Sequence, residues 1–160
     1  MKVLKKATPV PKKEKAYFVD TNIFLRALIN DDDKTYTDVL TFLEGIKNNR
    51  FKAYSSSLVL AEIVWTLSSF YKLGKVGVVK SLESIINLNG LMFVENLDGT
   101  KALDLYKTHN VKYIDCLICS GLNKTKKAWT IVSYDVDFDK LGIKRVEPKA
   151  LYGRYIRNIR

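Results

Sequence analysis

Short apolar runs alternate with longer segments of helical periodicity along most of this chain. We predict strands at the short runs, which are residues 16–19, 51–54, 91–94, 129–132 and 144–146. Between them, apolar residues recur every three or four positions, as in helices that bury one face. In the helix predicted after residue 57, Ala61, Val64 and Trp65 are among the expected inward positions. This alternation predicts a three-layer α/β domain with a mostly parallel central sheet flanked by helices.

The two ends of the chain differ from its middle in composition. Residues 1–15 carry six lysines and two prolines with little to bury, which predicts a flexible basic arm. All of the predicted strands lie in residues 16–147, and residues 148–160 form a basic C-terminal tail. We therefore expect one folded domain between two basic ends, because 160 residues suit a single hydrophobic core.

The net charge of +10 changes the expected choice of partner. An excess of cations favours a polyanion such as nucleic acid, since each neutralised phosphate releases counterions. A lysine-rich solvated surface explains the same composition equally well. No stretch approaches the roughly 18 apolar residues that span a bilayer, and the lysine-rich start lacks the apolar core of a secretory signal. We expect a cytoplasmic protein without a membrane segment.

The two cysteines, Cys116 and Cys119, form the one Cys-x-x-Cys motif of the sequence. A zinc site needs two more ligands, and the single histidine, His109, lies in a different segment. A redox pair is one alternative. The other, which we favour, is two small apolar residues on a buried helical face.

Acidic residues recur where predicted strands end and where the following helices begin. Asp20 comes directly after the first strand, while Asp135 and Asp137 follow the fourth. Glu62 lies near the second turn of the helix after the second strand, and Asp115 lies near the first turn of another helix. In open α/β sheets, ligands bind at the carboxyl ends of the strands. If the strands are parallel, we expect these carboxylates to meet at one edge of the sheet.

A cluster of carboxylates is unfavourable by itself, because burying each one without a cation costs several kcal/mol. A hard divalent cation such as Mg²⁺ removes that cost, and it can activate water for phosphodiester hydrolysis. Each acid also has a structural explanation of its own, as a helix cap, a first-turn residue or a turn residue. The prediction of a metal site therefore depends on all of them meeting.

Four blocks of sequence, in this order, resemble the PIN-domain family over about residues 16–146, and within it the VapC-like toxin ribonucleases. The first block is Tyr17-Phe18-Val19-Asp20-Thr21-Asn22-Ile23-Phe24-Leu25, the second is Ser57-Leu58-Val59-Leu60-Ala61-Glu62-Ile63, the third is Tyr113-Ile114-Asp115-Cys116-Leu117-Ile118 and the fourth is Ser133-Tyr134-Asp135-Val136-Asp137-Phe138. After Asp115 the family usually has alanines, whereas this chain has Cys119, Ser120 and Gly121, which are also small.

The resemblance implies a Mg²⁺- or Mn²⁺-dependent endoribonuclease that leaves 5′-phosphate and 3′-hydroxyl ends. Asp20 and Asp115 match the principal metal ligands. Glu62 matches the acid that acts through water, and Asp135 matches the acid that completes the site. The resemblance also implies supporting roles for Asn22 and Ser133, with Asp137 a further contributor. As partners it implies RNA, a small antitoxin and a second copy of the chain.

Other functions stay open at the level of sequence. A housekeeping PIN nuclease in RNA processing or turnover would carry the same acids without an antitoxin. A non-catalytic RNA-binding PIN module is expected to lose some of them. A phosphotransferase of the haloacid dehalogenase type needs a second aspartate two residues after the first, where this chain has Asn22. The RNA target and the identity of the metal are not indicated by the sequence.

Overall fold

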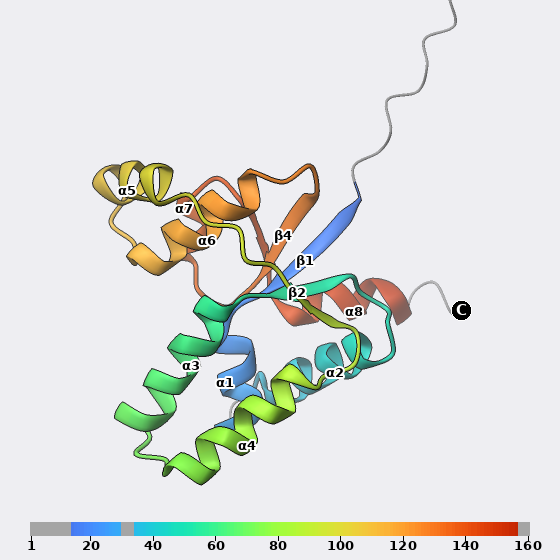
Figure 1. Ribbon diagram of the computed structural model, residues 1–160. Helices are drawn as coiled ribbons and strands as arrows, with labels where there is room; N and C mark the ends of the chain where they lie inside the picture. The colour runs from blue at the N-terminus through green and yellow to red at the C-terminus, as the bar shows by residue number, and fades with distance from the viewer. Residues whose placement is uncertain (1–13, 30–33, 157–160) are drawn as a thin grey trace, which may run out of the picture.

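The computed structural model describes residues 14–29 and 34–156, and Figure 1 shows their arrangement. The predicted basic arm lies outside the described residues except for Glu14 and Lys15. The last residues of the predicted basic tail, 157–160, also lie outside them.

Five parallel strands form the centre of the molecule. They are β1 (Lys15–Val19), β2 (Ala53–Ser55), β3 (Leu91–Phe93), β4 (Ala128–Val132) and β5 (Lys144–Val146). Their order is β3-β2-β1-β4-β5, and every neighbouring pair is parallel. β2 begins two residues later than predicted, because Phe51 packs its ring against Tyr17 and Phe42 instead of joining the sheet. The prediction of a mostly parallel sheet is confirmed.

Helices cover both faces of this sheet (Figure 1). Those in the described residues are α1 (Thr21–Ile29), α2 (Tyr36–Lys47), α3 (Ser57–Ser69), α4 (Lys75–Ile86), α5 (Gly99–Thr108), α6 (Tyr113–Asn123), α7 (Asp137–Lys140) and α8 (Pro148–Ile156). Helices α5 and α6 lie on one side of the sheet, and α1, α2 and α8 lie on the other (Figure 1). None of the described helices is long and apolar enough to cross a membrane. The three-layer α/β fold is therefore as predicted.

Helix α8 is an element that the sequence pattern does not predict. It begins at Pro148, whose fixed φ angle suits the first turn of a helix. It packs against α2, and the Tyr152 hydroxyl is hydrogen-bonded to the Asp38 carboxylate. Residues 148–156 thus form a helix that packs on the domain.

Helix α3 buries a stripe that matches the predicted one only in part. Val59, Ile63 and Leu67, each four residues apart, are fully buried. Ala61 is exposed and Trp65 is 66% exposed, so the prediction that these two face inward is wrong. Residues two positions from a buried one point to the opposite side of a helix, because each residue turns the helix by about 100°. Trp65 is consequently available at the surface.

Helix α6 has more buried residues than any other described helix, and its small side chains allow close packing. Cys116 and Cys119 are free and fully buried, as predicted. Burial raises the pKa of both thiols, which keeps them protonated and unreactive. A β-carbon added at Gly121 would lie 1.8 Å from the carbonyl oxygen of Asn96. An alanine at position 121 would therefore push α6 away from the loop that contains Asn96.

Candidate active site

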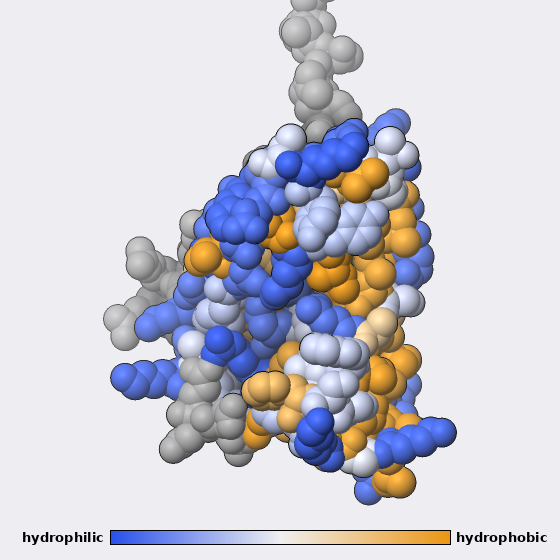
Figure 2. Space-filling model, turned by 90° about the vertical axis from the view of Figure 1, so that its left-hand side faces the viewer, coloured by the Kyte–Doolittle hydropathy of each residue, from blue (hydrophilic) through white to orange (hydrophobic). Residues whose placement is uncertain are grey.

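A cleft of about 390 Å³ opens at the carboxyl edge of the sheet. It is lined by Asp20, Thr21, Asn22, Leu25, Glu62, Trp65, Thr66, Lys112, Asp115 and Asp135. Figure 2 views this edge of the molecule and shows a hydrophilic centre with hydrophobic side chains along one side. The cleft lies where the strand order reverses, since β2 and β3 extend from one side of β1, and β4 and β5 from the other.

The four acids of the predicted site come from four separate segments and all line this one cleft. Asp20 directly follows β1, Glu62 is on α3, Asp115 is on the first turn of α6, and Asp135 is in the turn after β4. The parallel strands bring Asp20, Glu62 and Asp135 to one edge, because β1, β2 and β4 each end there, and α6 begins beside them with Asp115.

A network of short hydrogen bonds fixes the Asp20 carboxylate. Its Oδ2 atom accepts one bond from Asn22 Nδ2 at 2.7 Å and one from Ser133 Oγ at 2.7 Å. Asn22 Nδ2 also donates to Ser133 Oγ at 2.8 Å. The backbone N–H of Asp20 donates to the Val132 carbonyl at 3.2 Å, which continues the pairing of β1 with β4. Asn22 and Ser133 therefore hold Asp20 in one orientation.

Asp20 and Asp115 are buried charges that the described residues do not neutralise. Asp20 is 5% exposed and Asp115 is 4% exposed. Burial raises the pKa of Asp115 to about 7, and the negative charge of Asp20 adds to the increase. Burial also raises the pKa of Asp20 to about 6, against the lowering effect of the bond from Ser133. Within the described residues, Asp115 Oδ2 has no hydrogen-bond partner.

The other two acids have protein partners. The Thr21 hydroxyl donates to Glu62 Oε2 at 2.5 Å. Lys112 Nζ donates to Asp135 Oδ2 at 3.1 Å. Partial burial alone would raise the pKa of Asp135, but the backbone N–H of Asp137 and the Lys112 ammonium outweigh it and lower that pKa. Asp135 is therefore ionised, and Lys112 is a cation at the rim of the cleft.

Five of the residues that line the cleft were not indicated by the sequence motifs as functional, among them Lys112, Thr21 and Trp65. Lys112 precedes α6, and one lysine among many gives no signal by itself. Thr21 lies inside the Asp-Thr-Asn motif, but its bond to Glu62 depends on how α1 and α3 pack. Trp65 follows Glu62 by almost one helical turn and was expected in the core. Asp137, by contrast, does not line the cleft and pairs with Lys140 at 2.6 Å.

The donor set of the cleft fits a hydrated divalent cation better than a closed cage. Across the described ranges, no group of three or more His, Cys, Asp or Glu side chains is already arranged to hold a metal ion. Mg²⁺, however, is commonly held by one or two carboxylates together with several waters. Asp115, with its unpartnered Oδ2, and Asp20 supply hard oxygen ligands, and a divalent cation would offset the cost of burying the two carboxylates together.

Comparison with known proteins gives relatives in sequence and in structure. VapC ribonuclease of Aquifex aeolicus (strain VF5) is 29% identical over 131 residues, which are 81% of this chain and 95% of that protein. The structure of VapBC2 from Rickettsia felis, bound to a DNA fragment from their promoter, matches with a TM-score of 0.55 and 21% identity over 82% of this chain and 98% of that chain.

A further similar structure is that of VapC20 from Mycobacterium tuberculosis, a toxin that cleaves the sarcin-ricin loop. It matches with a TM-score of 0.59 and 16% identity over 81% of this chain and 98% of that chain. At these identities the two structures show a shared fold. The family model of the PIN domain matches residues 17–144, which include all four acids of the cleft. With this match over most of its length, the chain belongs to the PIN domain family.

Proposed function

We propose that this protein is a metal-dependent endoribonuclease that hydrolyses RNA phosphodiester bonds, and that it is the toxin of a toxin–antitoxin pair. The observation that carries the proposal is the meeting of Asp20, Glu62, Asp115 and Asp135 in one cleft, with two of them buried and not neutralised. Similarity to the Aquifex ribonuclease, which extends over 95% of that protein, supports the same activity.

In this proposal Asp20 and Asp115 hold the divalent ion, either Mg²⁺ or Mn²⁺. When bound, the ion supplies Lewis-acid activation of water and stabilises negative charge on the phosphate. Asn22 and Ser133 keep Asp20 oriented through the bonds described above. These two hydrogen bonds are preformed, so little reorganisation is needed when the site is filled.

The remaining residues of the cleft have complementary roles. Glu62, positioned by Thr21, orients the attacking water for in-line displacement. Asp135 completes the acidic site, and Lys112 attracts the RNA phosphate that the carboxylates alone would repel. The water oxygen would bond to phosphorus as the bond from phosphorus to the 3′-oxygen breaks. The proton that the water loses passes through solvent to the leaving 3′-oxygen, which gives 3′-hydroxyl and 5′-phosphate ends.

An exposed apolar surface beside the cleft supports a protein partner. On α3, on α4 and in the loop between them, large apolar side chains are unusually accessible, with Trp65 66%, Phe70 73% and Val76 71% exposed. Burial of such a surface is a main driving force of protein association. We propose that an antitoxin or a second copy of the chain covers it, and that the protein acts in the cytoplasm, where its RNA substrates are.

The activity is tested with purified protein and a mixed structured RNA in the presence of Mg²⁺, Mn²⁺ or EDTA. We expect cleavage with either metal, none in EDTA, and none with Asp20→Asn, whose circular dichroism should match that of the wild type. End analysis should give 5′-phosphates. Equal cleavage by wild type and Asp20→Asn would reveal a contaminating nuclease, and no cleavage by folded wild type with bound RNA would favour a binding module.

The toxin assignment is tested separately from the chemistry. We expect expression of the wild type, but not of Asp20→Asn, to stop bacterial growth, and co-expression of the product of the adjacent gene to restore it. Cleavage in vitro without any effect on growth would favour the housekeeping nuclease.

A further inference from the structure

Lysines gather at the edge of the sheet opposite the acidic cleft. Four of the five strands begin with a lysine or directly follow one or two, and these residues are Lys15 in β1, Lys52 before β2, Lys126 and Lys127 before β4, and Lys144 in β5. Because all five strands are parallel, their amino ends lie at one edge. We call these five lysines the amino-edge cluster.

Only part of this positive charge is neutralised within the described chain. Glu14 bridges Lys52 and Lys127, so one carboxylate serves two ammonium groups. Lys15, Lys126 and Lys144 are exposed and have no carboxylate of the described residues within salt-bridge distance. Five lysines against one glutamate leave a strongly positive edge. The sequence adds five more lysines in residues 1–13, which join the chain directly before Glu14.

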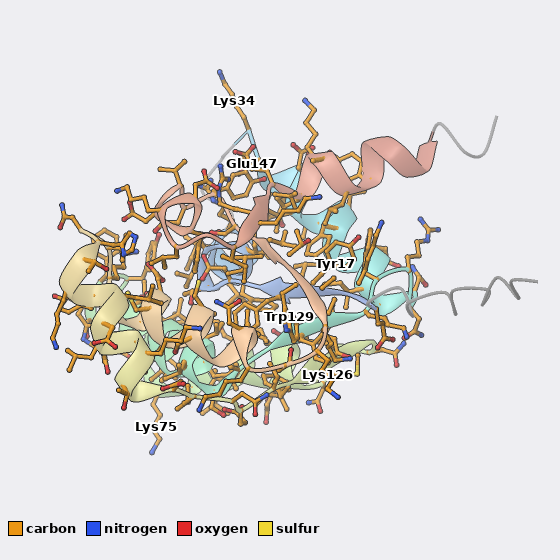
Figure 3. All side chains as sticks on the ribbon, turned by 90° about the horizontal axis from the view of Figure 1, so that it is seen from above. Tyr17, Lys34, Lys75, Lys126, Trp129 and Glu147 are labelled. Carbon is orange, nitrogen blue, oxygen red and sulfur yellow. The ribbon has the colours of Figure 1, made fainter. Side chains whose placement is uncertain are left out.

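The same edge is hollowed and contains aromatic groups. A pocket of about 200 Å³ lies between Lys15 and Lys144, with Tyr17, Trp129 and Thr130 in its wall. Nearby, Lys127 Nζ lies 5.0 Å from the ring centre of Tyr54. Figure 3 places Tyr17, Trp129 and Lys126 together on the side where β1 begins, and Lys34 and Lys75 away from it. Positive grooves with aromatic side chains are typical of surfaces that bind single-stranded nucleic acid.

We propose that the amino-edge cluster is a second RNA-binding surface, which contacts the phosphate backbone of a long RNA at a distance from the acidic cleft. This proposal rests on the proposed function, since it supplies a contact for the same substrate. The five residues of β1 separate the two sites by about 16 Å in a straight line, at about 3.3 Å per residue. The straight line passes through the sheet, so an RNA that follows the surface needs a longer path, whereas four stacked nucleotides advance only about 14 Å at about 3.4 Å each.

The surface therefore distinguishes long RNA from short RNA. A long substrate gains phosphate contacts at the amino edge that do not touch the scissile bond, so its binding is tighter and more sensitive to salt. A substrate of about four nucleotides occupies the cleft alone. Its cleavage should not depend on the amino-edge lysines.

The test compares two charge-matched double variants. Lys126→Gln with Lys144→Gln removes two unpaired cations of the cluster. The control, Lys75→Gln with Lys80→Gln, removes two exposed cations of α4 and changes the net charge equally. Binding of a fluorescent RNA of about 40 nucleotides is measured by anisotropy in EDTA at several salt concentrations, so the readout requires no cleavage.

We expect the amino-edge variant to bind the long RNA about tenfold more weakly at 0.1 M salt, with the slope of log K against log salt reduced by about 1.4, or 0.7 for each lost contact. The control should keep the wild-type slope, and with Mg²⁺ or Mn²⁺ both variants should cleave the short RNA at the wild-type rate. An unchanged slope in the amino-edge variant, or an equal loss in both variants, would overturn the proposal. A wild type that binds but never cleaves would instead refute the nuclease function and leave this test intact.

Discussion

The two edges of the central sheet carry opposite charge, and the two sets of charges differ in their energetic cost. At the carboxyl ends, Asp20 and Asp115 are buried, and burial raises the pKa of both. At the amino ends, Lys15, Lys126 and Lys144 are exposed. An exposed ammonium group remains hydrated and costs the fold little, whereas a buried carboxylate without a cation is unfavourable.

Because of this difference in cost, the buried carboxylates are stronger evidence of a binding site than the exposed lysines are. A pair of buried like charges lowers the stability of the folded chain, so its presence indicates a ligand that offsets this loss when it binds. Surface lysines carry no such cost, and their meaning depends on their position along one edge and on the pocket between them. Mutations at the two ends should therefore have contrasting effects on activity, stability and RNA binding.

The largest expected effect is the loss of cleavage in Asp115→Asn. The substitution keeps the size of the side chain but removes a charge that the proposal assigns to the metal. Loss of groups that merely support a metal ligand commonly costs 10- to 100-fold, so we expect a decrease of more than about 100-fold in kcat/KM. The check is a cleavage assay beside a circular dichroism spectrum. Wild-type cleavage by the folded variant would show that Asp115 is not a ligand.

A smaller loss is expected when Asp20 keeps its charge but loses its support. Ser133→Ala removes the 2.7 Å bond to Asp20 Oδ2 and the acceptor for Asn22 Nδ2. We expect cleavage to fall about 10-fold, with weaker activation at low metal concentration, because support of a ligand tunes its affinity for metal. Metal titrations of the cleavage rate provide the measurement. A pure decrease in protein stability, with unchanged metal dependence, would make Ser133 structural only.

The stability of the metal-free protein should depend on pH through the acidic end. The pKa of Asp115 is raised from 3.8 to about 7, so the folded state binds this proton more tightly than the unfolded state. Stability therefore falls as pH rises from about 4 to about 7 and then levels off. Relative to wild type, Asp115→Asn should gain about 2 kcal/mol between about pH 5 and about pH 8. Urea unfolding in EDTA measures it, and a pH-independent difference would contradict it.

The smallest effect on stability is expected at the amino edge. Lys126→Gln with Lys144→Gln removes exposed groups that lack a carboxylate partner in the described chain. We expect the free energy of unfolding to change by less than about 0.5 kcal/mol, as is usual for surface substitutions. The same urea experiment applies. A larger loss would mean that these lysines stabilise the fold, and their effect on RNA binding would then need a variant that is folded at full stability.

The sequence predicts the frame of the site better than its contacts. Asp20 directly follows one apolar run and Asp135 comes three residues after another, and parallel pairing of β1 with β4 then brings the two segments together. The Lys112–Asp135 pair escapes prediction, because it depends on how the start of α6 sits against the turn after β4. The same holds for Thr21 and Glu62, which meet only through the packing of α1 against α3.

The exposure of Trp65 and the presence of α8 are two features that the sequence pattern does not predict. Apolar residues on α3 fit more than one stripe, and the sheet selects Val59, Ile63 and Leu67, which leaves Trp65 at the surface. Residues 148–156 have a basic composition that gives no clear helical pattern, and their helix is stabilised by packing on α2. In both cases tertiary contacts decide between alternatives that local pattern leaves equal.

If the buried carboxylates form a cation site, the folded protein should bind Mn²⁺ through Asp20 and Asp115. A ligand that binds the folded state alone raises stability by RT ln(1 + [L]/Kd). We predict that Mn²⁺ raises the urea midpoint of the wild type and that calorimetry detects its binding, whereas a folded Asp20→Asn, Asp115→Asn double variant shows neither. Equal stabilisation of both proteins, or no binding to the wild type, would contradict the account.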